Sequence, residues 1–148
     1  MTRRISRTTF IRLILALFLG LPLFLQPAEA DAAGAKYIVV SLAQQRVYAY
    51  QGNTLVFSIR ANIRGARRGT FRVQNKIPVA RSSVLGWRLP YWLGIYHGKG
   101  GLQNGFHGYA TTSRGNIATN SLGCIVMAPS GAARLYAWAR VGTSVTIK

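Results

Sequence analysis

Cys124 and His107 are the side chains of this sequence best suited to chemistry on a carbonyl group. Cys124 is the single cysteine of the 148-residue chain and ends the run Ser121-Leu122-Gly123-Cys124, where the glycine permits a tight turn beside the sulfur. His107 lies between glycines in Gly105-Phe106-His107-Gly108, at the expected end of a strand. An imidazole there can take the proton of a thiol, and backbone N–H groups near the cysteine can hold an oxyanion. The pattern indicates cysteine-dependent nucleophilic catalysis. The alternative is a small buried cysteine and a hydrogen-bonded core histidine.

Acidic residues are almost absent from the chain. It has 19 lysines and arginines but only two acids, Glu29 and Asp31, and its formal net charge is +17. The lack of later carboxylate side chains excludes a paired-acid glycosidase, a carboxylate-rich calcium or magnesium site and a triad ending in Asp or Glu. A group that orients His107 must then be a backbone carbonyl, such as that of Gly108, or a hydroxyl, such as that of Ser121. The charge favours acidic partners, among them the anionic polymers of a bacterial wall.

The first thirty residues have the pattern of an export signal. Four arginines precede an apolar run over residues 13–25, and Ala28-Glu29-Ala30 places small residues where a signal peptidase reads. We predict a signal peptide over 1–30 and a mature chain that begins at Asp31, without a stable membrane anchor, in the periplasm, the cell wall or the extracellular space. An uncleaved anchor is the alternative, although the run is short for a membrane span.

The remaining residues, 31–148, predict one mainly β domain with a helix in its C-terminal half. Alternating or β-branched runs predict strands over 37–41, 46–50, 54–59, 70–74 and 144–148, with a basic loop over 60–69. A helix is expected from Pro129 to about Val141, ended by Gly142. Residues 75–104 contain prolines and several glycines, and we expect long loops there with one short strand over 92–96.

The two site segments together resemble the signature of the L,D-transpeptidase catalytic domain, also called the YkuD domain, a family that cross-links peptidoglycan. The signature is His107-Gly108 followed at a distance by Ser121-x-Gly123-Cys124. The resemblance continues over nearly all of the chain after the leader. It includes the opening strands over 37–48, a Gly-x-Phe strand over 69–73, an aromatic element over 89–92 and a closing strand over 142–147.

The resemblance implies a β-sandwich-like or barrel-like scaffold with the site in a cleft under a mobile flap. It makes Cys124 the nucleophile and His107 its base, with Ser121, Leu122 and Gly123 shaping the cysteine loop and its oxyanion hole. In this family the thiolate attacks the carbonyl of a diaminopimelate or equivalent residue in a stem tetrapeptide, expels D-Ala and passes the acyl group to an amine. That reaction needs no metal and no cofactor. We expect a thiol more reactive than a free cysteine, because a histidine cation and backbone donors favour the thiolate.

Other residues are candidates for substrate contacts. Trp92 and Tyr91 belong to an aromatic cluster with Trp87 and Tyr96, and aromatic loops on a β scaffold commonly line binding sites. The alternative for each ring is that it caps the core.

The chain departs from the family pattern at two places. Val126 stands where the family commonly has Arg or Asn, and Arg67-Arg68 replaces a Thr-Pro pair. Arg114 can supply the missing positive group, or it is a solvated loop charge. His97 competes with His107 for the role of base but lacks the spacing, and we interpret it as a wall or loop residue.

Three classes of function remain open. The first is an L,D-transpeptidase or its hydrolytic counterpart, an L,D-carboxypeptidase. The second is a catalytically weak cationic module that binds peptidoglycan. The third, a secreted protein that binds nucleic acid or anionic lipid, rests on charge alone, because no nucleic-acid motif with a stacking platform is present. We therefore expect no nucleic-acid partner. The sequence gives no oligomeric state.

Overall fold

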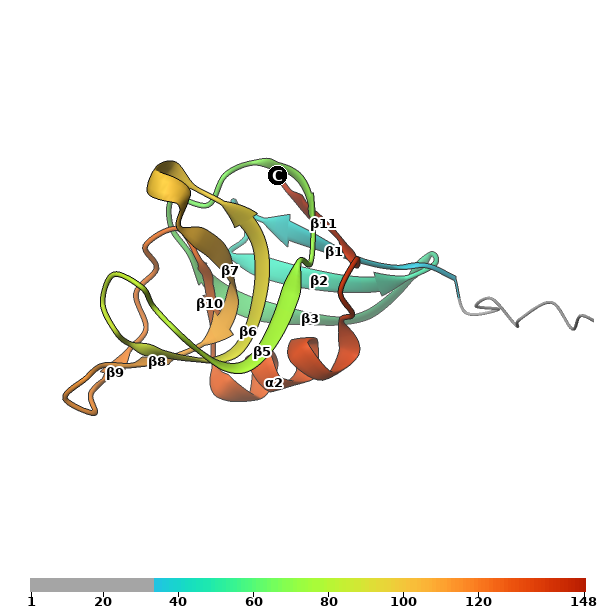
Figure 1. Ribbon diagram of the computed structural model, residues 1–148. Coiled ribbons are helices and arrows are strands. Elements are labelled where there is room, and N and C mark those ends of the chain that lie inside the picture. The colour runs from blue at the N-terminus through green and yellow to red at the C-terminus, as the bar shows by residue number, and fades with distance from the viewer. Residues whose placement is uncertain (1–33) are drawn as a thin grey trace, which may run out of the picture. The chain divides into compact units, whose positions relative to one another are not determined.

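The computed structural model describes residues 34–148 as a mainly β domain with one α-helix, which confirms the predicted fold class (Figure 1). The predicted signal peptide and the predicted terminus at Asp31 lie outside the described residues. The strands are β1 (Lys36–Ser41), β2 (Arg46–Gln51), β3 (Thr54–Ile63), β4 (Gly69–Arg72), β5 (Asn75–Arg81), β6 (Arg88–His97), β7 (Gln103–Gly108), β8 (Ala110–Thr111), β9 (Ile117–Ala118), β10 (Ile125–Met127) and β11 (Ser144–Ile147). The helices are the 3-10 turn η1 (Lys99–Gly101) and α2 (Pro129–Trp138).

The strands form one sheet in the order β4-β11-β1-β2-β3-β10-β7-β6-β8-β9, with β5 paired to β6. β1 and β11 are parallel, as are β7 and β10. β3 joins the two halves of the sheet: Thr54 to Arg60 pair with β2, whereas Ala61, Asn62 and Ile63 pair with β10. The strand therefore transmits the position of the N-terminal hairpin directly to the segment that follows Cys124.

The main core collects side chains from both halves of the sheet and from α2. On β1 and β2 every second residue is buried, as the alternating pattern predicts. The largest fully buried side chains of the main core include Ile38, Leu93, Phe106, Ile125 and Leu135. A second, smaller cluster of Leu89, Trp92 and Ala110 lies against Cys124. The reactive segment is thus supported by packed strands on both sides.

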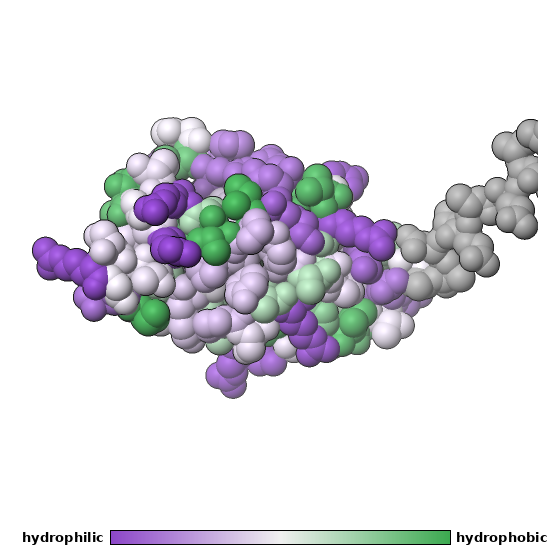
Figure 2. Space-filling view, turned by 60° about the horizontal axis from the view of Figure 1, so that its bottom comes forward, coloured by the Kyte–Doolittle hydropathy of each residue, from purple (hydrophilic) through white to green (hydrophobic). Residues whose placement is uncertain are grey.

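Helix α2 begins at Pro129, as predicted, but ends at Trp138 rather than near Val141. Ala139 has an extended backbone conformation. Two lysines bind the carbonyls at this end: Lys76 Nζ donates to those of Tyr136 and Ala139, at 2.7 and 2.6 Å, and Lys36 Nζ donates to that of Trp138 at 3.2 Å. Cations are favourable at the negative C-terminal end of a helix. None of the helices in residues 34–148 is long and apolar enough to cross a membrane. Figure 2 shows that hydrophobic side chains are scattered over the side it brings forward rather than gathered in one patch.

Residues 60–63 and 75–104 differ from the sequence prediction. β3 continues four residues beyond Ile59, because its end finds a second partner in β10. Residues 75–104 hold β5, β6 and the start of β7 instead of long loops, and the short strand expected over 92–96 is part of β6. Pro78 is tolerated because β5 pairs only with β6, so that one edge needs no N–H donor. Gly105 lies where a Cβ would come within 2.2 Å of the Leu93 carbonyl oxygen, so this glycine permits close strand pairing rather than ending a strand.

Gln45 fixes the point at which β3 leaves β2. Its side-chain oxygen accepts from Ile63 N–H at 2.8 Å, and its amide nitrogen donates to the carbonyls of Leu42 and Ile63 at 2.8 and 3.1 Å. Gln45→Ala should lower the free energy of unfolding by about 3 kcal/mol, since it removes three hydrogen bonds that each contribute about 1 kcal/mol. Unfolding in urea measures this change in the free energy of unfolding. Gln44→Ala removes only one exposed bond, to Tyr48, and is the control. Equal effects of the two substitutions would contradict this role of Gln45.

Candidate active site

The strand register brings Cys124 and His107 to the same face of the sheet. β10 runs parallel to β7 with Ile125 opposite Phe106 and Val126 opposite His107, so Cys124, just before β10, falls beside Gly105. Side chains two residues apart on a strand share a face, which makes Cys124 a diagonal neighbour of His107. Both side chains line one small cavity of about 70 Å³, together with Trp87, Leu89 and Ala110 among others.

The thiol of Cys124 is half-buried and lies beside an amide. Its sulfur lies 3.6 Å from Asn104 Oδ1, an oxygen that can only accept, so the S–H donates to it. Burial raises the pKa of Cys124, and a hydrogen bond from the backbone of Gly105 acts in the opposite direction. Sequence analysis did not single out Asn104, because an isolated asparagine among glycines gives the signal of a turn rather than of a site.

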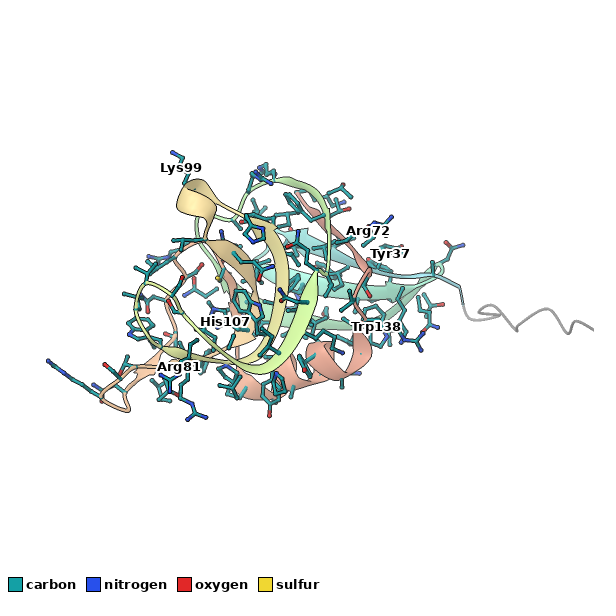
Figure 3. All side chains as sticks on the ribbon, viewed as in Figure 1. Tyr37, Arg72, Arg81, Lys99, His107 and Trp138 are labelled. Atoms are coloured by element: carbon teal, nitrogen blue, oxygen red, sulfur yellow. The ribbon has the colours of Figure 1, made fainter. Side chains whose placement is uncertain are left out.

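His107 is buried and is oriented by a backbone carbonyl. Its Nδ1 lies 2.6 Å from the carbonyl oxygen of Gly108. A carbonyl only accepts, so Nδ1 carries the proton and Nε2 keeps a free lone pair. Burial lowers the pKa of His107, and the bond to Gly108 offsets this in part. Figure 3 shows His107 inside the domain, whereas Lys99 points outward from η1.

Trp92 fixes the imidazole from one side. The two rings are stacked, with centroids 6.0 Å apart and an interplanar angle of 22°. The indole N–H of Trp92 donates to Asn75 Oδ1 at 3.0 Å, and Asn75 in turn donates to Gln103 Oε1 at 2.9 Å. Asn75 lies on β5 and Gln103 on β7, the two strands that flank β6. The sequence did not predict either residue as part of the site, because polar side chains of this kind carry no recognisable motif.

The environment of the pair favours a neutral thiol and a neutral imidazole. Burial raises the pKa of Cys124 and lowers that of His107, so each group is displaced away from its charged form. Burial of the two groups therefore disfavours the expected pair of a thiolate and a histidine cation. The reason is desolvation, which outweighs the donors around the sulfur. A histidine with a free Nε2 can instead act as a base toward a thiol that keeps its proton until reaction.

Ser121 and Gly123 set the shape of the cysteine loop. The Ser121 hydroxyl lies within hydrogen-bonding distance of the carbonyls of Cys124 and Arg64, and accepts from the N–H groups of Arg64 and Gly123, both at 3.3 Å. Gly123 has φ +111°, and a Cβ there would come within 2.9 Å of Asn104 Oδ1. Because the Gly123 N–H is engaged by Ser121, the N–H groups of Leu122 and Cys124 are the remaining candidates for an oxyanion hole.

Two larger cavities meet at this loop. The apolar cleft, about 500 Å³, has Cys124 in its wall and is lined by Ile77, Val79, Leu85, Trp92, Leu102 and Leu122 among others. The basic pocket, about 730 Å³, includes Arg67, Tyr96, His97, Lys99 and Leu122 in its lining. Leu122 is 73% exposed and borders both. His97 thus lies in the basic pocket, while only His107 of the two histidines shares a cavity with the thiol.

The other sequence-level candidates fall in different places. Trp92 lines the apolar cleft, but Tyr91 is exposed and packs against Tyr136 of α2, with ring centroids 6.0 Å apart. Arg114 is exposed in the turn between β8 and β9 and borders none of the three cavities described above. Val126 is buried opposite His107 in β10. A cation at 126 would have no carboxylate side chain to pair with in residues 34–148.

The described domain matches a known family over almost its whole length. The family model of the L,D-transpeptidase catalytic domain, YkuD, matches residues 35–147. The chain therefore belongs to this family, as the resemblance of its two site segments indicated.

Solved structures with the same fold include L,D-transpeptidases from two bacteria. The one from Stackebrandtia nassauensis is 22% identical with a TM-score of 0.61, covering 82% of this chain and 61% of that protein. L,D-transpeptidase 1 of Mycobacterium tuberculosis is 20% identical with a TM-score of 0.60, covering 76% and 61%. A fused Zn-dependent amidase/peptidase/peptidoglycan-binding domain-containing protein from Clostridium acetobutylicum is 24% identical with a TM-score of 0.62, covering 76% and 51%. The chain thus spans 51% to 61% of these relatives. A comparison with curated protein sequences finds no match.

The lowered pKa of His107 predicts a loss of stability in mild acid. The unfolded histidine has its ordinary pKa of about 6.5, so below that pH the unfolded state binds more protons than the native state and the free energy of unfolding falls. No carboxylate side chain in residues 34–148 obscures this. Between about pH 7.5 and pH 5, His107→Gln should flatten the decrease measured by denaturant unfolding. A slope that is the same in wild type and His107→Gln would contradict the prediction.

Proposed function

We propose that the protein is a peptidoglycan L,D-transpeptidase in which Cys124 is the nucleophile and His107 its general base. The observation that carries the proposal is the register of β7 and β10, which sets the single cysteine and an oriented histidine into one cavity of a domain of this family. The substrate class is the stem tetrapeptide, and residues 31–148 constitute the catalytic domain. No residue is assigned to a metal or a cofactor.

In the first half-reaction the sulfur attacks the carbonyl of the diaminopimelate or equivalent residue. The thiol proton passes to Nε2 of His107, and the oxyanion is stabilised by backbone N–H groups near Leu122 and Cys124. The C–N bond to D-Ala then breaks, and the proton on His107 goes to the departing amine. A thioester on Cys124 and free D-Ala are the products of this step.

In the second half-reaction an acceptor amine attacks the thioester carbon and gives a proton to His107. The C–S bond breaks, the sulfur recovers its proton, and the new amide is released. The apolar cleft and the basic pocket both border Leu122, so the donor and the acceptor can approach the cysteine loop from different sides. Water in place of the amine would make the enzyme an L,D-carboxypeptidase.

The hydrogen bond from Nδ1 of His107 to the Gly108 carbonyl supports the role of base. It leaves Nε2 free and replaces the acidic residue of a conventional triad, which this part of the chain does not contain. Because a carbonyl stabilises an imidazolium less than a carboxylate does, the proton is expected to stay on His107 only while the tetrahedral intermediate exists.

A carbapenem and a tetrapeptide test the pair separately. One L,D-transpeptidase of similar structure was solved in complex with imipenem, so intact mass after incubation with a carbapenem should show one covalent adduct on the wild-type chain. Cys124→Ser should give no adduct and release no D-Ala. His107→Ala should slow acylation on the order of a hundredfold or more.

His97→Ala is the matched control and should change acylation little, because His97 faces the basic pocket. Release of D-Ala by folded Cys124→Ser would refute the proposal. An acyl-enzyme that forms normally but passes its acyl group only to water would assign the carboxypeptidase activity. A wild-type chain that binds sacculi without acylation would assign the weak binding module instead.

We further propose that the protein acts outside the cytoplasm after removal of residues 1–30. Amino-terminal sequencing of protein recovered from the exported fraction should begin at Asp31, because Ala28 and Ala30 fit the preference of signal peptidase. Recovery of the full chain from membranes alone would support the uncleaved anchor. Ala30→Leu, which places a large residue at the cleavage position, should retain the leader in the otherwise unchanged protein.

A further inference from the structure

Cationic side chains line up across one end of the sheet formed by β4, β11, β1, β2 and β3, outside the site described above. Arg46 is directly opposite Arg60 on the neighbouring strand. On its other side Arg46 is opposite Ser41 at the end of β1. The parallel register of β1 and β11 places Lys148, the residue after Ile147, beside Ser41.

Backbone hydrogen bonds confirm this alignment. Lys148 N–H donates to the Val40 carbonyl at 3.0 Å, and Leu42 N–H donates to the Lys148 carbonyl at 2.9 Å. Ile147 is also opposite Gly69 of β4, so Arg68 lies at the same end of the sheet. Figure 1 shows the C-terminal end of β11 close to the end of β1 and to the loop between β3 and β4. We call Arg60, Arg46, Lys148 and Arg68 the cationic row.

The side chains of Arg46, Arg60 and Lys148 lie on the face of the sheet that is turned away from the core. Val47, Val40 and Ile147 are buried, and the residues next to them on each strand, Arg46, Ser41 and Lys148, therefore occupy the opposite face. Arg60 and Lys148 are exposed, and Arg46 is half-buried. Adjacent strands are about 4.8 Å apart, so a row across five strands extends about 19 Å.

No acidic side chain of the described domain lies beside the row. Residues 34–148 contain no acidic side chain, and the side-chain hydrogen bond of Arg46 in this region goes to a neutral hydroxyl, Ser58 Oγ, at 3.1 Å. Like charges directly opposite each other on neighbouring strands are unfavourable. An anion between Arg46 and Arg60 would relieve that repulsion, so the row is complementary to a ligand with several negative groups.

The surroundings of the row favour a hydroxylated polymer over a membrane or a nucleic acid. Beside the arginines the same outer face presents Ser41, Tyr48 and Ser58, and the apolar side chain nearest to them, Val39, is half-buried, so this part of the face offers little apolar surface to a lipid. Tyr37 and Tyr50 on this face are stacked on each other, with centroids 5.0 Å apart and an angle of 7°. Each ring therefore has one face covered by the other tyrosine, which leaves less aromatic surface for stacking with nucleic-acid bases.

Arg67 connects the row to the candidate active site. It is the neighbour of Arg68 in the chain and lines the basic pocket. Its backbone N–H donates to the Tyr96 hydroxyl at 2.9 Å, and its guanidinium lies 5.0 Å from the centroids of the Phe71 and Tyr96 rings. These contacts fix the loop, so a polymer bound along the row lies close to the basic pocket.

We propose that the cationic row is a second peptidoglycan-docking surface, which binds the carboxylates of stem peptides that are not in the active site. The proposal rests on the proposed function for its choice of polymer, but it assigns binding to residues that take no part in the chemistry. Such a surface would keep the enzyme on an insoluble substrate between turnovers.

Co-sedimentation with peptidoglycan sacculi, freed of attached proteins and accessory polymers, tests the surface. The binding protein is the Cys124→Ser chain, so catalysis cannot influence the result. Arg46→Gln together with Arg60→Gln should weaken binding on the order of tenfold or more, because two charged hydrogen bonds are removed. The control is Arg72→Gln together with Arg140→Gln, which removes the same charge from exposed residues, Arg72 lying at the other end of β4. If the double variant does not fold, Arg60→Gln alone replaces it in the test, because it changes only an exposed side chain. It should still weaken binding to sacculi.

Each outcome decides one point. Strong loss in the row variant, little loss in the control and loss of binding to sacculi whose carboxylates have been amidated would support the proposal. Equal losses of binding in the two double variants would overturn the proposal, because net charge alone would then explain the binding. Tighter binding of the same surface to anionic vesicles or to single-stranded DNA would overturn the choice of partner. Failure of the proposed function is recognised separately, as a wild-type chain that binds sacculi through the row but forms no acyl-enzyme.

Discussion

The absence of carboxylate side chains from residues 34–148 is the constraint on which the rest of the domain depends. Every cation that needs a partner must find a carbonyl, a hydroxyl, a ring face or solvent. Lys76 is bound by the carbonyls at the end of α2, and the Arg134 guanidinium lies 4.3 Å from the centroid of the Phe57 ring. His107 follows the same rule with the carbonyl of Gly108. The domain thus builds both its helix end and its reactive pair from main-chain oxygens.

The reactive pair depends on strand pairing rather than on a loop that happens to lie nearby. β10 has only the residues Ile125 to Met127, yet it is hydrogen-bonded to β3 on one side and β7 on the other. Its position is therefore determined by two longer strands. Since Cys124 directly precedes β10 and His107 lies within β7, the relative placement of sulfur and imidazole is as rigid as the sheet itself. The hydrogen bonds of Ser121 extend this rigidity to the residues before the cysteine.

Much of the fold was accessible from the sequence, because the N-terminal strands alternate regularly and α2 begins with a proline. The N-terminal hairpin, the last strand and the two segments of the site were predicted near their observed positions. Residues 75–104 were not, because prolines and glycines carry the ordinary signal of a loop. In this domain Pro78 lies on an edge strand and Gly105 at a close strand contact. Asn104 and Asn75 were missed for a related reason: a polar side chain whose partner is distant in sequence has no local pattern, and only the register of β5, β6 and β7 brings it to the thiol or to Trp92.

The composition has a consequence for the electric field of the domain. Between about pH 4 and pH 9 the side chains of residues 34–148 whose charge ordinarily changes are His97, His107 and Cys124. The 15 lysines and arginines that remain after the four of the leader ordinarily keep their charge throughout this range, although burial and the nearby Lys36 lower the pKa of Lys76. The field is consequently nearly the same in acidic and in neutral surroundings. Any change in attraction with acidity is then dictated by the ionisation of the partner, and the protein behaves as a cation of fixed strength.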